Sequence, residues 1–331
     1  MNGGEDISIT ARCAGTDMSG GAIGESIILD FTRHMNRLVG GPLPTKTKAQ
    51  WTITVEPGMF YRDFEKITLA KGLILPCFTA SKSINAIGGM FGNNSAGERT
   101  LKYGQTEKYV VSSKVIFADG NEYEVKPLAR AELDRKISQG DFEGNVYKNI
   151  FNLIQENAKE IEQARPQVSK NASGYYLWNV FQNNVFDLNK LLVGSQGTLG
   201  IVTEITLKLI PNNKHSKLAV IFMDDLAPLG RVVKDVVTLN PESLETYDDK
   251  TMKLAVRFFP GFLKNKGLFK MVKFMWSFLP EFFMLLSGGF PKLIILVEFA
   301  GENEQELEAQ CRKLQEKIKD FKLKIYITKS E

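Results

Sequence analysis

Glycine clusters constrain this chain more than any other feature of its sequence. Three segments combine several glycines with small or polar residues: 12–21 (RCAGTDMSGG), 88–97 (GGMFGNNSAG) and 194–202 (GSQGTLGIV). Such segments turn tightly and let a ligand approach the backbone closely. One cluster alone is a weak signal, because glycine-rich turns are common. The three together are explained by one large, extended ligand.

The first cluster lies between two apolar segments, 7–11 and 26–31, that we predict to be strands. Its glycines allow successive backbone N–H groups to point inward and hold an anion. Arg12 adds a planar cationic group suited to phosphate oxygens, and Thr16 and Ser19 add hydroxyl donors. A glycine-rich hairpin loop without a ligand remains the alternative for this segment.

Two familiar phosphate-binding motifs are excluded by spacing. The chain has no G-x-x-x-x-G-K-S/T, and no G-x-G-x-x-G that leads into a helix. The loop runs from strand to strand, so the helix N-terminus that those motifs use is missing. A nucleotide bound here is therefore expected in an architecture other than the Rossmann fold.

The rest of the chain predicts an α+β protein with two domains. We place the boundary at Pro211–Asn213, giving a first domain at 1–212, with subdomains at about 1–50 and 51–212, and a second at 213–331. In the first domain we expect strands at 51–56, 110–118 and 203–209 and helices at 61–71 and 147–162, with Asp119-Gly120 closing a hairpin. In the second, strands at 217–223, 243–247, 293–299 and 324–328 alternate with helices at 227–239 and 304–321. Two β-α-β units of this length suggest a ferredoxin-like sandwich.

Composition narrows the class of protein. Lysine and arginine total 42 against 38 acidic residues in 331, a near balance that gives no case for nucleic-acid binding. The three cysteines are far apart in sequence, which argues against a zinc site and suggests a reducing cytoplasm. Neither a signal peptide nor a transmembrane segment is expected.

One stretch departs from this balance. Residues 250–292 contain eight cationic residues and one acidic residue, together with nine of the 22 phenylalanines. Within it, residues 266–279 predict a basic amphipathic helix with Trp and Phe, which is typical of a segment that lies on a membrane surface, and the contact would extend over 258–290. The alternative is that these aromatic residues fill a core or cover a subunit contact.

The motifs, taken in order over residues 7–211, resemble those of the FAD-linked oxidases of the vanillyl-alcohol oxidase superfamily. The likeness is to the branch of glycolate oxidase and the D-lactate or D-2-hydroxyglutarate dehydrogenase flavoproteins. It rests on Arg12, Gly15-Thr16, Ser19-Gly20, Leu29-Asp30, Pro57-Gly58, Gly88-Gly89, Asn93-Asn94-Ser95, Gly97, Tyr103-Gly104 and Gly194 to Glu204. The resemblance implies an FAD-binding domain of the PCMH type, followed by an α+β cap domain.

The resemblance also implies where the cofactor would bind. The pyrophosphate of FAD would be held by the first cluster: Arg12, Ala14, Gly15, Thr16, Asp17, Met18, Ser19 and Gly20. The ribityl chain and flavin would lie against Pro76, Ser81, Gly88, Gly89, Asn93, Asn94 and Gly97. Backbone contacts would come from Gly197, Ile201 and Val202. Some members attach FAD covalently through a histidine in the first loop. Thr16 stands after Gly15 here, so non-covalent binding is expected, with Cys13 and Cys77 as packed small residues.

By the same resemblance, the activity would be oxidation of a 2-hydroxy acid, of the D-lactate, glycolate or D-2-hydroxyglutarate type. The hydride would go to flavin N5, and electrons would pass to a quinone, an electron-transfer flavoprotein or an iron–sulfur subunit. That would place the protein in the cytoplasm or peripherally on the inner face of the membrane. No catalytic or metal-binding residue is assigned, and His34 and His215 are expected to be exposed or capping residues.

The chain also departs from the family pattern. Members carry a longer segment before the first loop, and a histidine motif and a substrate-binding arginine after the cap. The resemblance therefore implies that the first sheet of the FAD domain and the cap domain are both incomplete. A non-catalytic flavin-binding subunit, or a truncated fragment completed by another polypeptide, is the alternative function.

Overall fold

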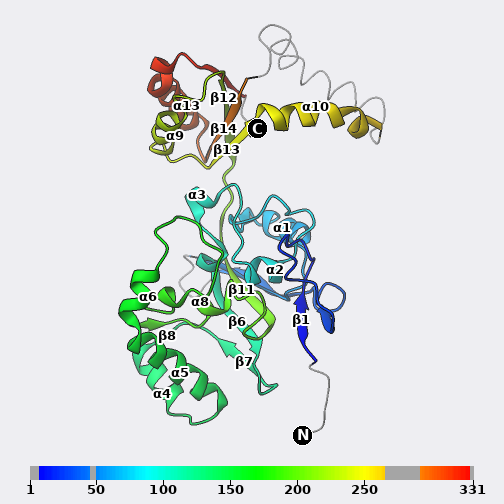
Figure 1. Ribbon diagram of the computed structural model, residues 1–331, viewed down its shortest axis with the longest axis vertical. Coiled ribbons are helices and arrows are strands. Elements are labelled where there is room, and N and C mark those ends of the chain that lie inside the picture. The colour runs from blue at the N-terminus through cyan, green and yellow to red at the C-terminus, as the bar shows by residue number, and fades with distance from the viewer. Residues whose placement is uncertain (1–6, 45–49, 265–290, 329–331) are drawn as a thin grey trace. The chain divides into compact units, whose positions relative to one another are not determined.

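The computed structural model describes residues 7–44, 50–264 and 291–328, and the chain divides into two compact units (Figure 1). The first unit is Met1–Asn212 and the second is Asn213–Glu331. Each unit has its own buried apolar core.

The first glycine cluster connects two parallel strands. β1 (Ile9–Arg12) pairs with β2 (Ile27–Asp30) in parallel, with Ile9 opposite Ile27 and Arg12 opposite Asp30. A tight hairpin joins only antiparallel strands, so the segment between them has to cross from one end of the pair to the other. The hairpin alternative for this loop is therefore excluded.

The main sheet of the first unit is antiparallel and has the order β3-β4-β11-β6-β7, with β5 pairing the end of β11. Its strands are β3 (Leu38–Pro44), β4 (Trp51–Val55), β5 (Leu73–Ile74), β6 (Val110–Ile116), β7 (Glu122–Val125) and β11 (Ile201–Pro211). Alternate residues of β11 are buried, as its alternating sequence predicts. The hairpin predicted at Asp119-Gly120 is confirmed, because β6 and β7 pair antiparallel on either side of it.

Helices and short strands complete the first unit. The predicted helix 147–162 begins earlier, at Phe142, where the Asp141 carboxylate accepts a hydrogen bond from Gly144 N (2.7 Å), and it is interrupted at Asn157. The helices are α1 (Tyr61–Leu69), α2 (Ile87–Gly92), α3 (Thr100–Tyr103), α4 (Arg130–Ile137), α5 (Phe142–Glu156), α6 (Ala158–Ala164), α7 (Leu177–Val180) and α8 (Asn189–Leu192). A small antiparallel sheet consists of β8 (Leu128–Ala129), β10 (Val185–Phe186) and β9 (Phe181–Gln182).

The second unit is an α+β sandwich. Its antiparallel sheet has the order β13-β14-β12-β15, and helices α9 and α13 contribute Val232, Val236, Leu307 and Leu314 to its core. The elements are β12 (His215–Met223), α9 (Leu229–Val237), β13 (Ser243–Asp248), α10 (Asp249–Lys264), β14 (Leu293–Gly301), α13 (Glu304–Ile318) and β15 (Lys324–Ile327). This strand order and direction are those of the predicted ferredoxin-like arrangement.

The segment predicted to contact a membrane, 258–290, is largely outside the described residues. Its first part, 258–264, belongs to α10, and residues 265–290 are not described. Among the helices that the structure describes, none combines the length and the hydropathy needed to cross a bilayer.

Candidate cofactor site

The three glycine clusters meet at one pocket of the first unit, with a volume of about 200 Å³. Residues from all three clusters line it, although they are far apart in sequence. The lining comprises Ala11, Cys13, Ala14, Gly15, Thr16, Asp17, Gly21, Ala22, Phe31, Pro57, Thr79, Ser81, Asn85, Ala86, Gly88, Gly89, Met90, Phe91, Gly92, Asn93, Ser95, Ser195, Gln196, Gly197, Gly200 and Val202. The pocket therefore has the extended, glycine-rich wall that the sequence predicts.

Arg12 shapes the first loop from behind. Its Nη1 donates a hydrogen bond to Ala22 O (3.0 Å), and a Cβ on Gly15 would lie 2.2 Å from Nη2 of the same guanidinium. Gly15 also has a φ of +64°, a left-handed conformation that favours glycine. Arg12 is not among the pocket-lining residues, so it holds the loop's shape from outside the pocket.

Asp17 accepts hydrogen bonds from the loop itself. Its carboxylate takes them from Ser19 N (3.1 Å), Ser19 Oγ (2.8 Å) and Gly21 N (2.9 Å). The Ser19 hydroxyl, followed by the Ser19 amide, lowers the pKa of Asp17 below its usual range, so the group is ionised at neutral pH. The loop is thus an anion-binding nest, and in this structure the anion is its own side chain.

The second cluster forms α2, a helix with glycines at 88, 89 and 92. A Cβ on Gly88 would lie 2.5 Å from Pro57 Cβ, 2.7 Å from Cys13 Sγ and 2.8 Å from Pro57 O. A Cβ on Gly89 would meet only Cys13 Cβ, at 3.8 Å. Gly88 therefore permits close packing of α2 on the loop before α1, whereas Gly89 leaves the helix backbone bare on the pocket side.

The third cluster contacts the second through backbone hydrogen bonds and the first through a side chain. Gly194 N donates to Phe91 O (3.0 Å) and Gln196 N donates to Gly92 O (2.8 Å), which ties the cluster to the end of α2. Gln196 has a φ of +55°, uncommon for a residue with a side chain. Its Oε1 would be 3.3 Å from a Cβ on Gly21, so this side chain reaches the first loop.

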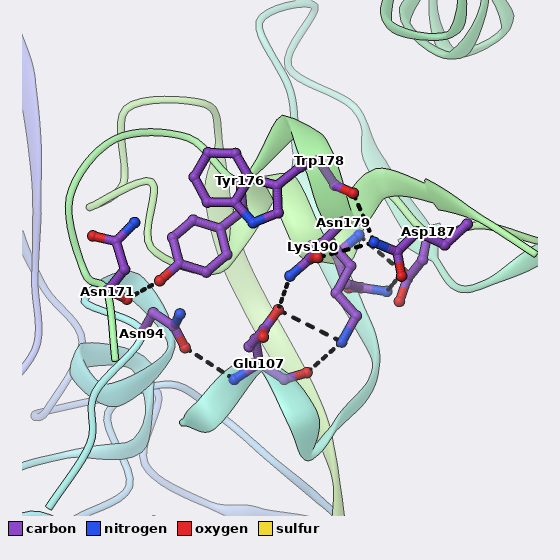
Figure 2. Close-up of polar contacts among 10 residues, drawn as sticks. Asn94, Glu107, Asn171, Tyr176, Trp178, Asn179, Asp187 and Lys190 are labelled. Atoms are coloured by element: carbon purple, nitrogen blue, oxygen red, sulfur yellow. Dashed lines mark hydrogen bonds and ion pairs between the residues drawn. The ribbon is translucent and has the colours of Figure 1, made fainter. Parts of the chain in front are cut away.

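A polar network connects the second cluster to the segment before the third cluster (Figure 2). Asn94 Oδ1 accepts a hydrogen bond from Glu107 N (3.0 Å), and the Glu107 carboxylate accepts one from Asn179 Nδ2 (3.1 Å). Lys190, in the helix before the third cluster, donates from Nζ to Glu107 O (2.6 Å). The Tyr176 hydroxyl donates to Asn171 O. These contacts connect the chain after α2 to the chain before residue 194, so the two clusters are held together.

One polar wall of the pocket was not predicted. Asn85 Nδ2 donates to Thr79 Oγ1 (2.7 Å), which lies 2.8 Å from Ser81 Oγ, and all three residues line the pocket. Asn85 Oδ1 is buried and has no hydrogen-bond partner. Of these residues only Ser81 was predicted to contact the cofactor, because nothing in the local sequence pattern shows that Thr79 and Asn85 reach the same pocket.

Cys13 and Asp17 are the pocket-lining residues with side chains that titrate. Burial raises the pKa of the Cys13 thiol to about 12, so it is protonated at neutral pH. Cys13 packs against Pro57 and Gly88 as a small residue, as predicted, but it also lines the pocket. Cys77 is fully buried. His34 is exposed and His215 is in β12, and neither lines the pocket.

The residues predicted to bind the cofactor divide into two groups. Those that line the pocket are Ala14, Gly15, Thr16, Asp17, Ser81, Gly88, Gly89, Asn93, Gly197 and Val202. Those outside the lining are Arg12, Met18, Ser19, Gly20, Pro76, Asn94, Gly97 and Ile201. Met18 is fully exposed, Pro76 and Asn94 are buried, and Ser19 is bonded to Asp17. Sequence reasoning missed Gln196 and Asn85, whose placement depends on tertiary packing.

Two features of the lining suit an extended ligand with a flat ring. Gly89 leaves the backbone of α2 uncovered, and the first loop carries N–H and hydroxyl donors, of which Ser19 N, Ser19 Oγ and Gly21 N are bonded to Asp17. In the part of the chain that the structure describes, no group of His, Cys, Asp and Glu side chains is arranged to hold a metal ion.

Comparisons with known proteins identify the part of the first unit that contains the first two clusters. Residues 3–126 match the model of a family described as "FAD binding domain". The match confirms the predicted FAD-binding domain and FAD as its cofactor.

Relatives extend the likeness beyond that domain. The chain is 25% identical over 310 residues to a D-2-hydroxyglutarate dehydrogenase of Pantoea ananatis, covering 93% of this chain and 28% of that protein. It is 28% identical over 249 residues to the glycolate oxidase subunit GlcD of Bacillus subtilis, covering 74% of this chain and 41% of that protein. The chain therefore spans less than half the length of these relatives.

A solved structure of an alkyldihydroxyacetonephosphate synthase resembles the fold, with a TM-score of 0.62 at 16% identity. The alignment covers 98% of this chain and 48% of that one. At this identity the likeness shows the fold alone, and it confirms the predicted α+β architecture.

Proposed function

We propose that this chain, whose residues 3–126 match an FAD binding domain, is an FAD-linked oxidase that binds FAD non-covalently in the pocket where its three glycine clusters meet. The pyrophosphate would lie on the first loop, at Ala14 to Asp17. The flavin would lie over α2, at Gly88 and Gly89, and the third cluster would contact it through Gly197 and Val202. The convergence of three distant clusters on one pocket is the observation that carries this proposal.

The residues outside the pocket lining have supporting roles in this proposal. Arg12, through its hydrogen bond to Ala22 O, holds the first loop open around the phosphates. Asn94 holds the end of α2 through Glu107. Gly97, where a Cβ would lie 1.9 Å from Phe78 O, allows the chain to turn tightly behind the flavin.

We further propose that the activity served by this site is oxidation of a 2-hydroxy acid to the 2-oxo acid. FAD would accept the hydride from the substrate's α-carbon. The support is the likeness to a D-2-hydroxyglutarate dehydrogenase and a glycolate oxidase subunit, over 93% and 74% of this chain. Within the chain, α2 and the third cluster orient the ring, and the Asn85–Thr79–Ser81 wall presents hydroxyl groups to it.

No proton acceptor for this reaction is assigned to the pocket. The Asp17 carboxylate accepts hydrogen bonds from Ser19 and Gly21 of its own loop, and the Cys13 thiol is protonated and packed against Pro57. Electrons would pass from the cofactor to a quinone, an electron-transfer flavoprotein or an iron–sulfur protein. Contact with a membrane through 258–290 remains a prediction.

The test is a flavin spectrum of the purified full chain reconstituted with FAD. Anaerobic addition of D-2-hydroxyglutarate, D-lactate or glycolate should bleach the flavin band with one of them, and L-2-hydroxyglutarate and L-lactate should leave it unchanged. Bound flavin that none of the acids reduces would support the non-catalytic subunit instead. A folded chain that retains no flavin would contradict the proposal.

A further inference from the structure

Asp17 gives the pocket an unexpected charge. Among the residues lining the pocket, it carries the one ionised side chain, and no lysine or arginine is present in that lining. The nearest cation in the first loop, Arg12, lies behind Gly15 with Nη1 engaged by Ala22 O. A loop positioned to receive phosphates thus presents a negative charge to them.

The carboxylate and a phosphate compete for the same donors. Asp17 uses Ser19 N, Ser19 Oγ and Gly21 N, three of the groups that could bind phosphate oxygens in this loop. Gly21 is in close contact with this carboxylate, since a Cβ there would lie 3.0 Å from Asp17 Oδ2. A phosphate on the loop therefore lies beside the Asp17 carboxylate or displaces it. Either way, its binding free energy depends on how much negative charge it carries.

We propose that Asp17 is a specificity-determining residue that selects an esterified pyrophosphate over a nucleoside diphosphate with a free terminal phosphate. The inference rests on the proposed binding of FAD. In FAD the pyrophosphate is esterified at both ends, so each phosphate carries one negative charge. ADP has the same adenosine diphosphate moiety, but its terminal phosphate is joined only through the anhydride oxygen and takes a second charge above about pH 6. Asp17 repels that extra charge.

The size of the effect follows from the exposure of the group. Asp17 is solvent-exposed, so its interaction with a charge about 4 Å away is close to the value in water. One extra unit of charge at that distance weakens binding by about fivefold. The selection is therefore modest, and it acts against free nucleotides that share half of the cofactor's structure.

The experiment measures FAD and ADP binding to the same set of full-length variants at pH 8. FAD is titrated by quenching of its fluorescence, and ADP by competition against bound FAD. Asp17→Asn is nearly isosteric and removes the charge, and its one carboxamide oxygen keeps the acceptor for Ser19 Oγ and Gly21 N while the hydrogen bond from Ser19 N is lost. Asp17→Gly is the second variant, in case the carboxamide of the first disturbs the loop. Glu25→Gln is the matched control, because Glu25 is an exposed acid of the same segment that does not line the pocket.

The expected result is a gain of about fivefold in ADP affinity relative to FAD affinity in Asp17→Asn and Asp17→Gly, with no change of this ratio in Glu25→Gln. Suppose that FAD binds the wild type, but the ratio of ADP to FAD affinity is unchanged in both Asp17 variants or shifts equally in Glu25→Gln. Asp17 then does not distinguish the two ligands, and the proposed function still stands. If folded wild-type protein and variants bind no FAD, the proposed function fails and this inference fails with it.

Discussion

Adjacent glycines of α2 allow the stability of the fold to be separated from the binding of the cofactor. Gly88→Ala places a methyl group within 3.0 Å of Pro57 Cβ, Cys13 Sγ and Pro57 O. One of these contacts is with backbone, and Gly88 N already donates to the same Pro57 O (2.7 Å), so relief requires a shift of α2. Gly89→Ala places its methyl group at an ordinary contact distance from Cys13 Cβ (3.8 Å). The rest of the methyl group faces the pocket.

Overpacking of this kind costs about 1–3 kcal/mol, and the gain in helix propensity from Gly to Ala offsets up to about 1 kcal/mol. We therefore expect Gly88→Ala to lower the free energy of unfolding of the first unit by about 1–2 kcal/mol. With a urea m-value of about 2 kcal/mol per molar, the midpoint falls by about 0.5–1 M. Gly89→Ala should be as stable as the wild type or slightly more stable, yet bind FAD at least tenfold more weakly, because its methyl group occupies the surface on which the ring lies.

Urea unfolding followed by circular dichroism measures the first effect, and FAD titration measures the second. Gly230→Ala serves as a control for the substitution itself, because Gly230 is a helical glycine of α9 with no neighbour within 4 Å of the added Cβ, and it does not line the pocket. The reasoning is refuted if Gly88→Ala unfolds at the wild-type urea concentration, or if Gly89→Ala binds FAD as tightly as the wild type.

Three other outcomes follow from side chains around the site. Hydrogen bonds from Arg37 lower the pKa of the buried Glu56 carboxyl. Their stabilisation is therefore complete above the unfolded-state pKa and is lost as the pH falls through the lower folded-state pKa. Below about pH 4, the free energy of unfolding should therefore fall less steeply with pH in Glu56→Gln than in the wild type. Urea unfolding at a series of pH values measures it, and parallel pH dependences of the two proteins would contradict this. Because the pKa of the Cys13 thiol is raised to about 12, we expect Cys13 to react with iodoacetamide at pH 7.5 far more slowly in the native chain than in urea. Mass spectrometry of the peptide that contains Cys13 measures both rates, and rapid labelling of the native chain would contradict the raised pKa. Asn189→Ala removes the carboxamide that donates a hydrogen bond to Asp187 Oδ1 (2.9 Å), and we expect it to lower the free energy of unfolding by about 1–3 kcal/mol. An unchanged urea midpoint would show that this carboxamide does not stabilise the fold.

Much of the fold was predictable because its strands carry strong local signals. β4 and β11 alternate apolar and polar residues, and Asp119-Gly120 marks the turn between β6 and β7. In the second unit every described strand falls within a few residues of its predicted position, because each is bounded by polar or turn residues.

Two of the elements that were missed, β3 and α2, oppose their local propensities. β3 contains two glycines and two prolines, and it forms at the sheet edge with shifts in register, where a missing N–H donor is tolerated. α2 contains three glycines, and it packs closely on Pro57 and Cys13 through Gly88, where a Cβ would collide with both. In both elements tertiary packing outweighs the local secondary-structure propensity, and the local sequence pattern does not indicate this packing.

The site was predictable in outline and not in detail. The three glycine clusters indicated one extended ligand, and they do meet at one pocket. The Asp17 carboxylate in the phosphate loop, the Asn85–Thr79 wall and the reach of Gln196 to Gly21 depend on where folded segments meet. A residue-by-residue reading of a single chain has no access to those contacts.

The central claim, that the three clusters form one FAD site, is tested most directly by hydrogen exchange. Peptides of the full chain are followed by mass spectrometry with and without saturating FAD. The account predicts slower exchange on FAD addition in all three segments, 12–22, 79–97 and 194–202, and no change in α5, which does not line the pocket. Slowing confined to one cluster, or no slowing in any of them, would contradict it.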